Sequence, residues 1–345
     1  MKHSKLIIFF LLITFSLSGI LAVDSSKQIS DENNEWYPFA LSEKMDPDSP
    51  ANIGKLVLDS PAGKHGFVTV KDGHFYFEDG TRARFWGTNL VFDANFPSKK
   101  ETEIMADRLA FFGFNAVRLH HMDRYFEPRG IFEDVAPAYK DPQLKETGHL
   151  SKKQLDKLDY LIYQLKLRGI YVNVNLLVSR HFTEADGVVD AEKLGMAAKP
   201  ASLFNPRLIE LQKKYAKDLL THYNPYTKLR YNEDPVIALV EITNENSIFN
   251  YWKIDGLNNI PPFSSQKTIP DYYIQELNTM WNLWLKKKYK TINNLHESWN
   301  FTIDEPIIKE NILPKEEYWA LEARNNANGT VERKNKAVNL KTINA

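Results

Sequence analysis

The sequence contains no cysteine, which excludes a disulfide framework, a cysteine-bound metal and a lipid-anchoring cysteine. It also lacks an excess of charge of either sign, because 44 Lys and Arg residues balance 44 Asp and Glu residues. This balance provides no electrostatic drive toward nucleic acid or an anionic membrane surface. We therefore expect a neutral partner and no nucleic-acid binding.

Long apolar runs are absent except at the amino terminus. There, two lysines precede an apolar stretch that starts at Leu6, and small residues near Ala22 are followed by the polar Asp24. This order is typical of a secretory signal peptide. Residues 1–22 are predicted to be that peptide, and the mature protein is predicted to be secreted, either periplasmic or extracellular. An uncleaved anchor is the alternative, because the run is about long enough to span a bilayer; no other membrane association is expected.

A glycine-rich phosphate-binding loop is also missing after the first predicted strand, which counts against a dinucleotide-binding fold. We expect no cofactor. Hydrophobic residues make up 43% of the chain and charged residues 26%, the proportions of an ordinary globular protein with a sizeable core.

The first ordered part of the chain is predicted to be antiparallel β structure. The stretch HFYFEDGTRARFWG contains two alternating runs joined at Asp79–Gly80, a pattern typical of a β-hairpin. Residues 23–80 are therefore predicted to be an N-terminal β-hairpin region, which could plug one end of a domain formed by residues 81–345.

Four apolar runs then alternate with amphipathic helices, and a further helical stretch follows. The predicted strands cover 82–90, 115–121, 170–178 and 236–243, and the predicted helices cover 98–113, 151–169, 205–223 and 271–299. The first helix is predicted to start at a capping box formed by Ser98 and Glu101. Such alternation predicts an α/β fold with a parallel sheet and helices outside. Polar residues collect where the strands end, which favours a (β/α)8 TIM barrel. The residues after 243 do not supply four more strands, so we expect an incomplete barrel in a truncated chain.

The fourth predicted strand ends in Asn244–Glu245. Glycosidic bonds are cut by two carboxyl groups, one of which donates a proton to the leaving oxygen. A Glu at the mouth of a buried strand is expected to have a raised pKa through partial desolvation, and an adjacent amide can hold a sugar hydroxyl without adding charge. Glu241 shares the strand face but lies about 13 Å away along the strand. It is therefore predicted to be a buried, hydrogen-bonded lining residue and not the second catalytic group.

Several segments together follow the pattern of one known group of enzymes: DGHFYFEDGTRARFWGTNL, FNAVRLHHMD, VEITNEN and WNLWLKKKY. They resemble the clan A glycoside hydrolases, specifically bacterial cellulase-like proteins of family 5. The resemblance covers about Trp36 to Trp299. It implies a (β/α)8 barrel and retaining hydrolysis of a β-linked glycan, with Glu245 as acid/base, Asn244 as its substrate-binding neighbour and Arg118 as the arginine that orients the nucleophile.

The same resemblance implies a nucleophilic Glu at the end of a seventh strand, which this chain does not contain. We therefore expect the nucleophile to be missing and the chain alone to be inactive. The predicted substrate-binding residues lie near the ends of the first three strands: Trp86, Asn89, His120, His121 and Asn175. Arg180 and His181 could line the same cleft or be solvated.

Two other functions stay open. The chain could be a carbohydrate-binding barrel without catalysis, or a metal-dependent barrel hydrolase that uses His120, His121 and Asp123. The metal hypothesis is weak, because neighbouring strand residues point to opposite faces and the sequence offers no further ligands at a suitable spacing. We expect no metal.

Overall fold

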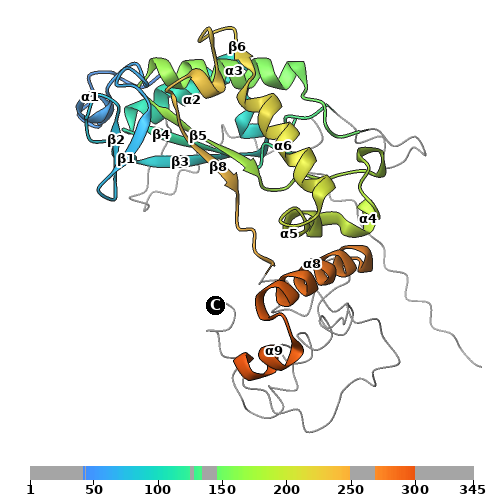
Figure 1. Ribbon diagram of the computed structural model, residues 1–345. Helices are drawn as coiled ribbons and strands as arrows, with labels where there is room; N and C mark the ends of the chain where they lie inside the picture. The colour runs from blue at the N-terminus through green and yellow to red at the C-terminus, as the bar shows by residue number, and fades with distance from the viewer. Residues whose placement is uncertain (1–41, 43, 125–127, 134–145, 249–268, 300–345) are drawn as a thin grey trace, which may run out of the picture. The chain divides into compact units, whose positions relative to one another are not determined.

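The structure is a computed structural model and describes residues 42, 44–124, 128–133, 146–248 and 269–299 (Figure 1). The predicted signal peptide and the residues after 299 lie outside this part. In the described ranges, no helix combines the length and apolar character needed to cross a membrane.

A hairpin precedes the main sheet, but it is formed by different residues from those predicted. Strands β1 (Val68–Lys71) and β2 (His74–Phe77) pair antiparallel around Asp72–Gly73, which both have positive φ, 51° and 73°, as a type I′ turn requires. At the predicted turn, Asp79–Gly80, the two sides of the chain are joined by a single bridge between Tyr76 and Arg82. Both Asp-Gly pairs form turns, but only the first joins two full strands.

The main sheet has four parallel strands in the order β3–β4–β5–β8 (Figure 1). Their bounds are β3 Gly87–Val91, β4 Ala116–His120, β5 Tyr171–Leu177 and β8 Ile237–Thr243. The predicted parallel α/β sheet is confirmed, except that β3 begins five residues later than predicted. The reason is Asn115, whose side-chain amide accepts from Trp86 N and donates to Arg84 O. These backbone groups are thereby withdrawn from strand pairing.

In the helices between the strands, the first residue of each predicted range is the N-cap. Helix α2 (Lys99–Phe111) has a complete capping box between Ser98 and Glu101. Ser151 caps α3 (Lys152–Leu167), and Asn205 caps α6 (Pro206–Leu220). In each case the cap side chain accepts from the third backbone N–H of the helix, which would otherwise have no partner.

The remaining elements are shorter or lie at the ends of the described chain. They are α1 Gly54–Val57, η1 Phe92–Asn95, η3 Glu184–Asp186, α4 Ala191–Leu194, η4 Gly195–Ala197, α5 Ala198–Ala201, β6 Tyr223–Asn224, β7 Leu229–Arg230, η5 Tyr231–Glu233, α8 Asp271–Tyr289 and α9 Ile292–Trp299. The last two correspond to the helical stretch predicted over 271–299.

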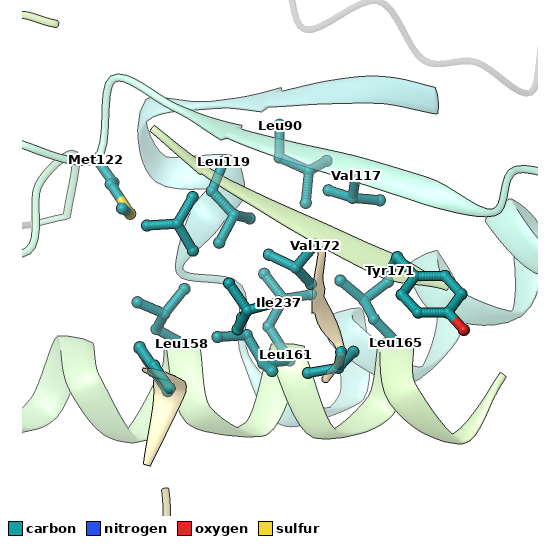
Figure 2. Packing of buried hydrophobic residues seen from close by; sticks show 14 of the residues in the cluster. Leu90, Val117, Leu119, Met122, Leu158, Leu161, Leu165, Tyr171, Val172 and Ile237 are labelled. Atoms are coloured by element: carbon teal, nitrogen blue, oxygen red, sulfur yellow. The ribbon is translucent and has the colours of Figure 1, made fainter. Parts of the chain in front are cut away.

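The main core lies between α3 and one face of the sheet (Figure 2). Leu158, Leu161 and Leu165 recur at helical spacing and point from α3 toward Val172 and Ile237. All three leucines are fully buried. A helix with such a stripe and a solvated opposite face is stabilised mainly by this packing.

A β-bulge changes which residues of β8 face this core. Val172 pairs with Ile237, but the next residue of β5, Asn173, pairs with Leu239. The extra residue in β8 lets Ile237 face α3 while Glu241, two residues beyond Leu239, turns to the opposite face. The bulge therefore places a carboxylate on the same face as the polar side chains of β4 and β5.

The hairpin covers the amino end of the sheet. Phe77 of β2 stacks on Tyr171, the first residue of β5, with ring centroids 5.2 Å apart. Phe85 meets both rings edge-on. The carboxyl ends of the strands lie at the other edge, where chemistry is found in parallel α/β folds.

We expect Leu161→Ala to lower the free energy of unfolding by about 2–5 kcal/mol, because it opens a cavity beneath the sheet. Leu167→Ala, in the same helix but at a side chain that is 47% exposed, should change it by less than about 0.5 kcal/mol. Urea unfolding of the full chain measures both. Equal effects would show that the α3 stripe is not the core.

A histidine near the hairpin is held between two carboxylates. His65 Nε2 lies 2.6 Å from Asp59 Oδ2, and its Nδ1 contacts Asp79 Oδ2. The hydrogen bond to Asp59, then that to Asp79, raises the pKa of His65. The bond from His65 lowers the pKa of Asp59, and the backbone N–H of Thr81 lowers that of Asp79.

The stabilising contribution of His65 should therefore be present below its ordinary pKa of about 6.5 and lost as the pH rises through the raised value. It should also be lost in acid, as pH falls through the lowered values of the two Asp residues. We expect His65→Gln to lower the Tm more at pH 5.5 than at pH 9. His74→Gln in β2 is the matched control and should show no such difference. A Tm loss for His65→Gln that is the same at both pH values would contradict the assignment.

Candidate active site

An ion pair spans three strands near the carboxyl edge of the sheet. Arg118 of β4 donates from Nε to Glu241 Oε2 and from Nη2 to Glu241 Oε1, both at 2.7 Å. Glu241 belongs to β8, so the two side chains meet across β5. Paired, charge-assisted bonds of this kind are short and fix the angle of both groups.

The pair determines the charge of Glu241. Hydrogen bonding from Arg118 lowers the pKa of Glu241, which outweighs the opposing effect of burial. Glu241 is therefore ionised at neutral pH and unsuited to donate a proton. This agrees with its prediction as a hydrogen-bonded lining residue. The resemblance assigns Arg118 to a catalytic nucleophile, but in the structure its carboxylate partner is Glu241.

Arg118 also orients Asn244. The same Nη2 donates to Asn244 Oδ1 at 2.9 Å, and the backbone N–H of Asn244 donates to Leu177 O at 2.9 Å. Because the amide oxygen is taken, the Nδ2 group is the free end of the side chain and a donor for a ligand oxygen. Asn244 is thus fixed from both its backbone and its side chain.

Glu245 follows directly and lies at the rim. Its side chain is exposed, so the burial that the sequence predicts for this carboxyl is not found. The reason is that β8 ends at Thr243 and is the last strand of the described sheet, with no neighbour on its outer side. Its backbone is left-handed, with φ 43°. A non-glycine residue in this region costs of order 1–3 kcal/mol, and such residues cluster at functional sites.

Two other strands also run into left-handed residues at this edge. Phe92 follows β3 with φ 55°, and His121 follows β4 with φ 56°. Their rings stack at 4.5 Å. Asn95 is fully buried and donates to both Phe92 O and His120 O, so it holds the two turns together.

The two predicted substrate-binding histidines lie side by side, with ring centroids 4.2 Å apart. Burial lowers the pKa of His120, and burial followed by the charge of His120 lowers the pKa of His121 to about 4. Both rings are therefore neutral at physiological pH. A neutral imidazole offers one donor and one acceptor, which suits a hydroxyl-rich ligand.

Asn175 lies between His120 and Glu241, near enough to influence the pKa of each. It is 0% exposed, and neither its Oδ1 nor its Nδ2 has a hydrogen-bond partner of proper geometry. The Oγ1 of Thr243 is buried without a partner as well. Both side chains can exchange hydrogen bonds with a hydroxyl group, because an amide offers a donor and an acceptor and a hydroxyl offers both.

Two predicted binding residues lie elsewhere. Trp86 precedes β3 and therefore stands at the amino edge, where it stacks on Phe114 and is 67% exposed. Asn89 lies in the middle of β3 and pairs in register with Arg118, so it shares the face of the site but not its rim. Both were expected at the end of the first strand. Trp86 falls outside β3 because the strand starts late, and Asn89 falls short of the rim because the strand continues to Val91.

Lys199 was not predicted as a site residue. It belongs to α5, and its carbonyl accepts from Asn246 Nδ2 at 2.8 Å. Burial lowers the pKa of Lys199, against the charges of Asp123, Glu245 and Glu241. Lys199 thus lies in the electrostatic surroundings of the site. Its sequence context, GMAAKPAS, contains no signal for this, because a long connection brings it there.

The hypothesis of a metal site on His120, His121 and Asp123 has no geometric support. Both carboxylate oxygens of Asp123 accept backbone N–H groups from the segment after β5. Within the described part of the chain, no group of three or more His, Cys, Asp or Glu side chains could hold a metal ion.

No family model and no curated protein matches the sequence. Among solved structures, similarity is found to an endo-1,4-β-mannanase from Rhizomucor miehei, with 16% identity over 64% of this chain and 58% of that one and a TM-score of 0.44. A family 5 glycoside hydrolase mannosidase from the same organism is also similar, with 17% identity over 53% of this chain and 49% of that one and a TM-score of 0.40. An endo-β-1,4-mannanase from Thermotoga petrophila has 18% identity over 61% of this chain and 41% of that one and a TM-score of 0.36. The chain spans about half the length of these proteins.

We expect Glu241→Gln to lower the free energy of unfolding by about 1.5–3 kcal/mol at pH 7, because it weakens hydrogen bonds from a charged donor in a half-buried site. As the matched control, Asp218→Asn removes an exposed ion pair with Lys214 on α6 and should cost less than about 1 kcal/mol.

The stability lost in Glu241→Gln should be smaller in acid, because the ionised Glu241 of the wild type is itself lost as pH falls through the lowered pKa. Urea unfolding at pH 7 and pH 4 measures both; equal costs at pH 7 would contradict the structural role of the pair.

Proposed function

We propose that the chain forms the acid/base side of a retaining glycoside hydrolase site in a (β/α)8 barrel, with a β-linked glycan as substrate. The observation that carries the proposal is the network of Arg118, Glu241 and Asn244. It keeps Glu241 ionised and paired, and it fixes Asn244 with its amide donor free. No described residue forms an ion pair or hydrogen bond with the side chain of Glu245, which leaves this carboxyl available to a substrate.

In this proposal Glu245 protonates the glycosidic oxygen as the bond from that oxygen to the anomeric carbon breaks. Asn244 Nδ2 donates to a hydroxyl of the sugar whose anomeric carbon reacts. The neutral His120 and the unpartnered Asn175 bind further hydroxyls. Desolvation of Glu245 would then come from the bound glycan, because the free side chain is exposed.

The second carboxylate of a retaining mechanism is not among the described residues that are placed in this site. An external nucleophile can then take its place. Azide would attack the anomeric carbon from the face opposite the leaving oxygen, forming a carbon–nitrogen bond, while Glu245 transfers its proton to the leaving oxygen. The product is a glycosyl azide of inverted configuration.

We expect the full chain with azide to cleave β-1,4-linked gluco- or manno-oligosaccharides to α-glycosyl azides, detected by mass spectrometry and NMR. Glu245→Gln should reduce this cleavage by about 10²–10⁴-fold but change the reaction of dinitrophenyl β-glycosides by less than about tenfold, because that leaving group needs no proton. Glu233→Gln, in η5 before the amino end of β8, is the matched control and should behave as the wild type.

Equal losses on both kinds of substrate would contradict the acid/base role. Binding of oligosaccharides without any azide product would favour the alternative, a carbohydrate-binding barrel without catalysis.

A further inference from the structure

Asp123 is a buried carboxylate that the proposed mechanism does not use. It lies three residues after β4 and is 0% exposed. Its oxygens accept from the backbone N–H groups of Val178 at 2.7 Å, Ser179 at 2.9 Å and Arg180 at 3.0 Å. The hydroxyl of Ser179 donates to it as well, at 3.2 Å.

These donors belong to the first residues after β5, which ends at Leu177. Leaving the sheet deprives their N–H groups of strand partners, and buried N–H groups need a replacement. Three consecutive N–H groups that converge on one oxygen-rich group form a concave anion site. Here that site is filled by the carboxylate of Asp123, which follows the neighbouring strand β4. The residues after β4 and after β5 are thereby held together.

The tied segment continues into two residues beside the site. His181 Nδ1 lies 2.9 Å from Ser179 O and 3.3 Å from Arg124 Nη1. Arg180 does not line the cleft, because its guanidinium packs over the rings of Phe132, Phe182 and Tyr215 and is 4% exposed. The base of the segment is thus anchored in the core, and His181 stands beside the end of β4.

A second hydrogen bond holds the connection between β5 and α6 further along the chain. Asn246, next to Glu245, donates to the carbonyl of Lys199. Lys199 is therefore linked to the end of β8, as His181 is linked to the end of β4. The connection between β5 and α6 is fixed at both sides of the edge that carries Asn244 and Glu245.

We propose that Asp123 is a positioning residue of the candidate site, which fixes the connection between β5 and α6 so that His181 and Lys199 border the sugar bound at Glu245. The identity of the ligand rests on the proposed glycoside hydrolase function. The role of Asp123 in holding the segment does not, and the two can be measured separately.

Asp123→Asn in the full chain tests the proposal. An amide has one acceptor oxygen and no charge, so the bond from Ser179 N–H to the second carboxylate oxygen at 3.0 Å is lost, and the remaining N–H groups donate to a neutral oxygen. We expect hydrogen exchange at the amides of Val178–Arg180 to accelerate by about tenfold or more, and the Kd for β-1,4-linked gluco- and manno-tetraoses to rise by about tenfold.

The matched control is Asp159→Asn. Asp159 of α3 is also buried and accepts from Tyr231 Oη at 2.7 Å and from His222 Nε2 at 2.8 Å. Asp159→Asn and Asp123→Asn should both lower the Tm, but Asp159→Asn should leave the Kd for the tetraoses unchanged. Ser179→Ala removes only the hydroxyl bond to Asp123 and keeps the test open if Asp123→Asn does not fold. It should raise the exchange rate at these amides and the Kd, each by up to about fivefold.

Wild-type Kd values in Asp123→Asn, or equal losses of binding in both Asp variants, would overturn the proposal. Unchanged exchange at residues 178–180 in the variant would overturn it also. Absence of tetraose binding in the wild type would instead contradict the proposed function, and the exchange rates would still decide whether Asp123 holds the segment.

Discussion

The bidentate pair between Arg118 and Glu241 is the interaction on which the geometry of the site depends. It joins β4 to β8 across β5, and the spare N–H group of the arginine holds Asn244. Without the pair, two charged side chains would share a half-buried polar face with no compensation, which is costly. With it, the strand edge has one ionised carboxylate that is paired with an arginine and one available carboxylate, Glu245.

The pair in turn depends on the backbone of β8. The bulge between Ile237 and Leu239 moves Glu241 to the face opposite α3, because one added residue reverses which face each later side chain occupies. An unbroken strand that keeps Ile237 in the core would direct Glu241 toward the helix layer. The same bulge therefore serves packing on one face and electrostatics on the other.

The helices, the parallel sheet and the polar strand ends could be predicted from the sequence, because each rests on local signals. Ser98 with Glu101 predicts the start of α2, and apolar runs predict β4, β5 and β8. The bulge could not be predicted, since it leaves no turn residue in IALVEIT, and the late start of β3 depends on the side chain of Asn115.

The candidate site was predictable in part for the same reason. Asn244, Glu245 and His120 follow from strand ends. The partner of Arg118 depends on register between strands that are 123 residues apart in sequence. Lys199 and the role of Asp123 depend on the path of a long connection, which carries no periodic signal. Trp86 was misplaced because an exposed aromatic beside a strand has the same local pattern at either edge of the sheet.

A crystal structure of the full chain with a bound β-1,4-linked gluco- or manno-tetraose would show whether Glu245 meets the scissile linkage. We expect a glycosidic oxygen within about 3.2 Å of the Glu245 carboxyl, with Asn244 Nδ2 on a hydroxyl of the adjacent sugar and Arg118 still paired to Glu241. A sugar bound at the amino edge, stacked on Trp86, or a glycan at the carboxyl edge whose linkages all lie away from Glu245, would contradict it.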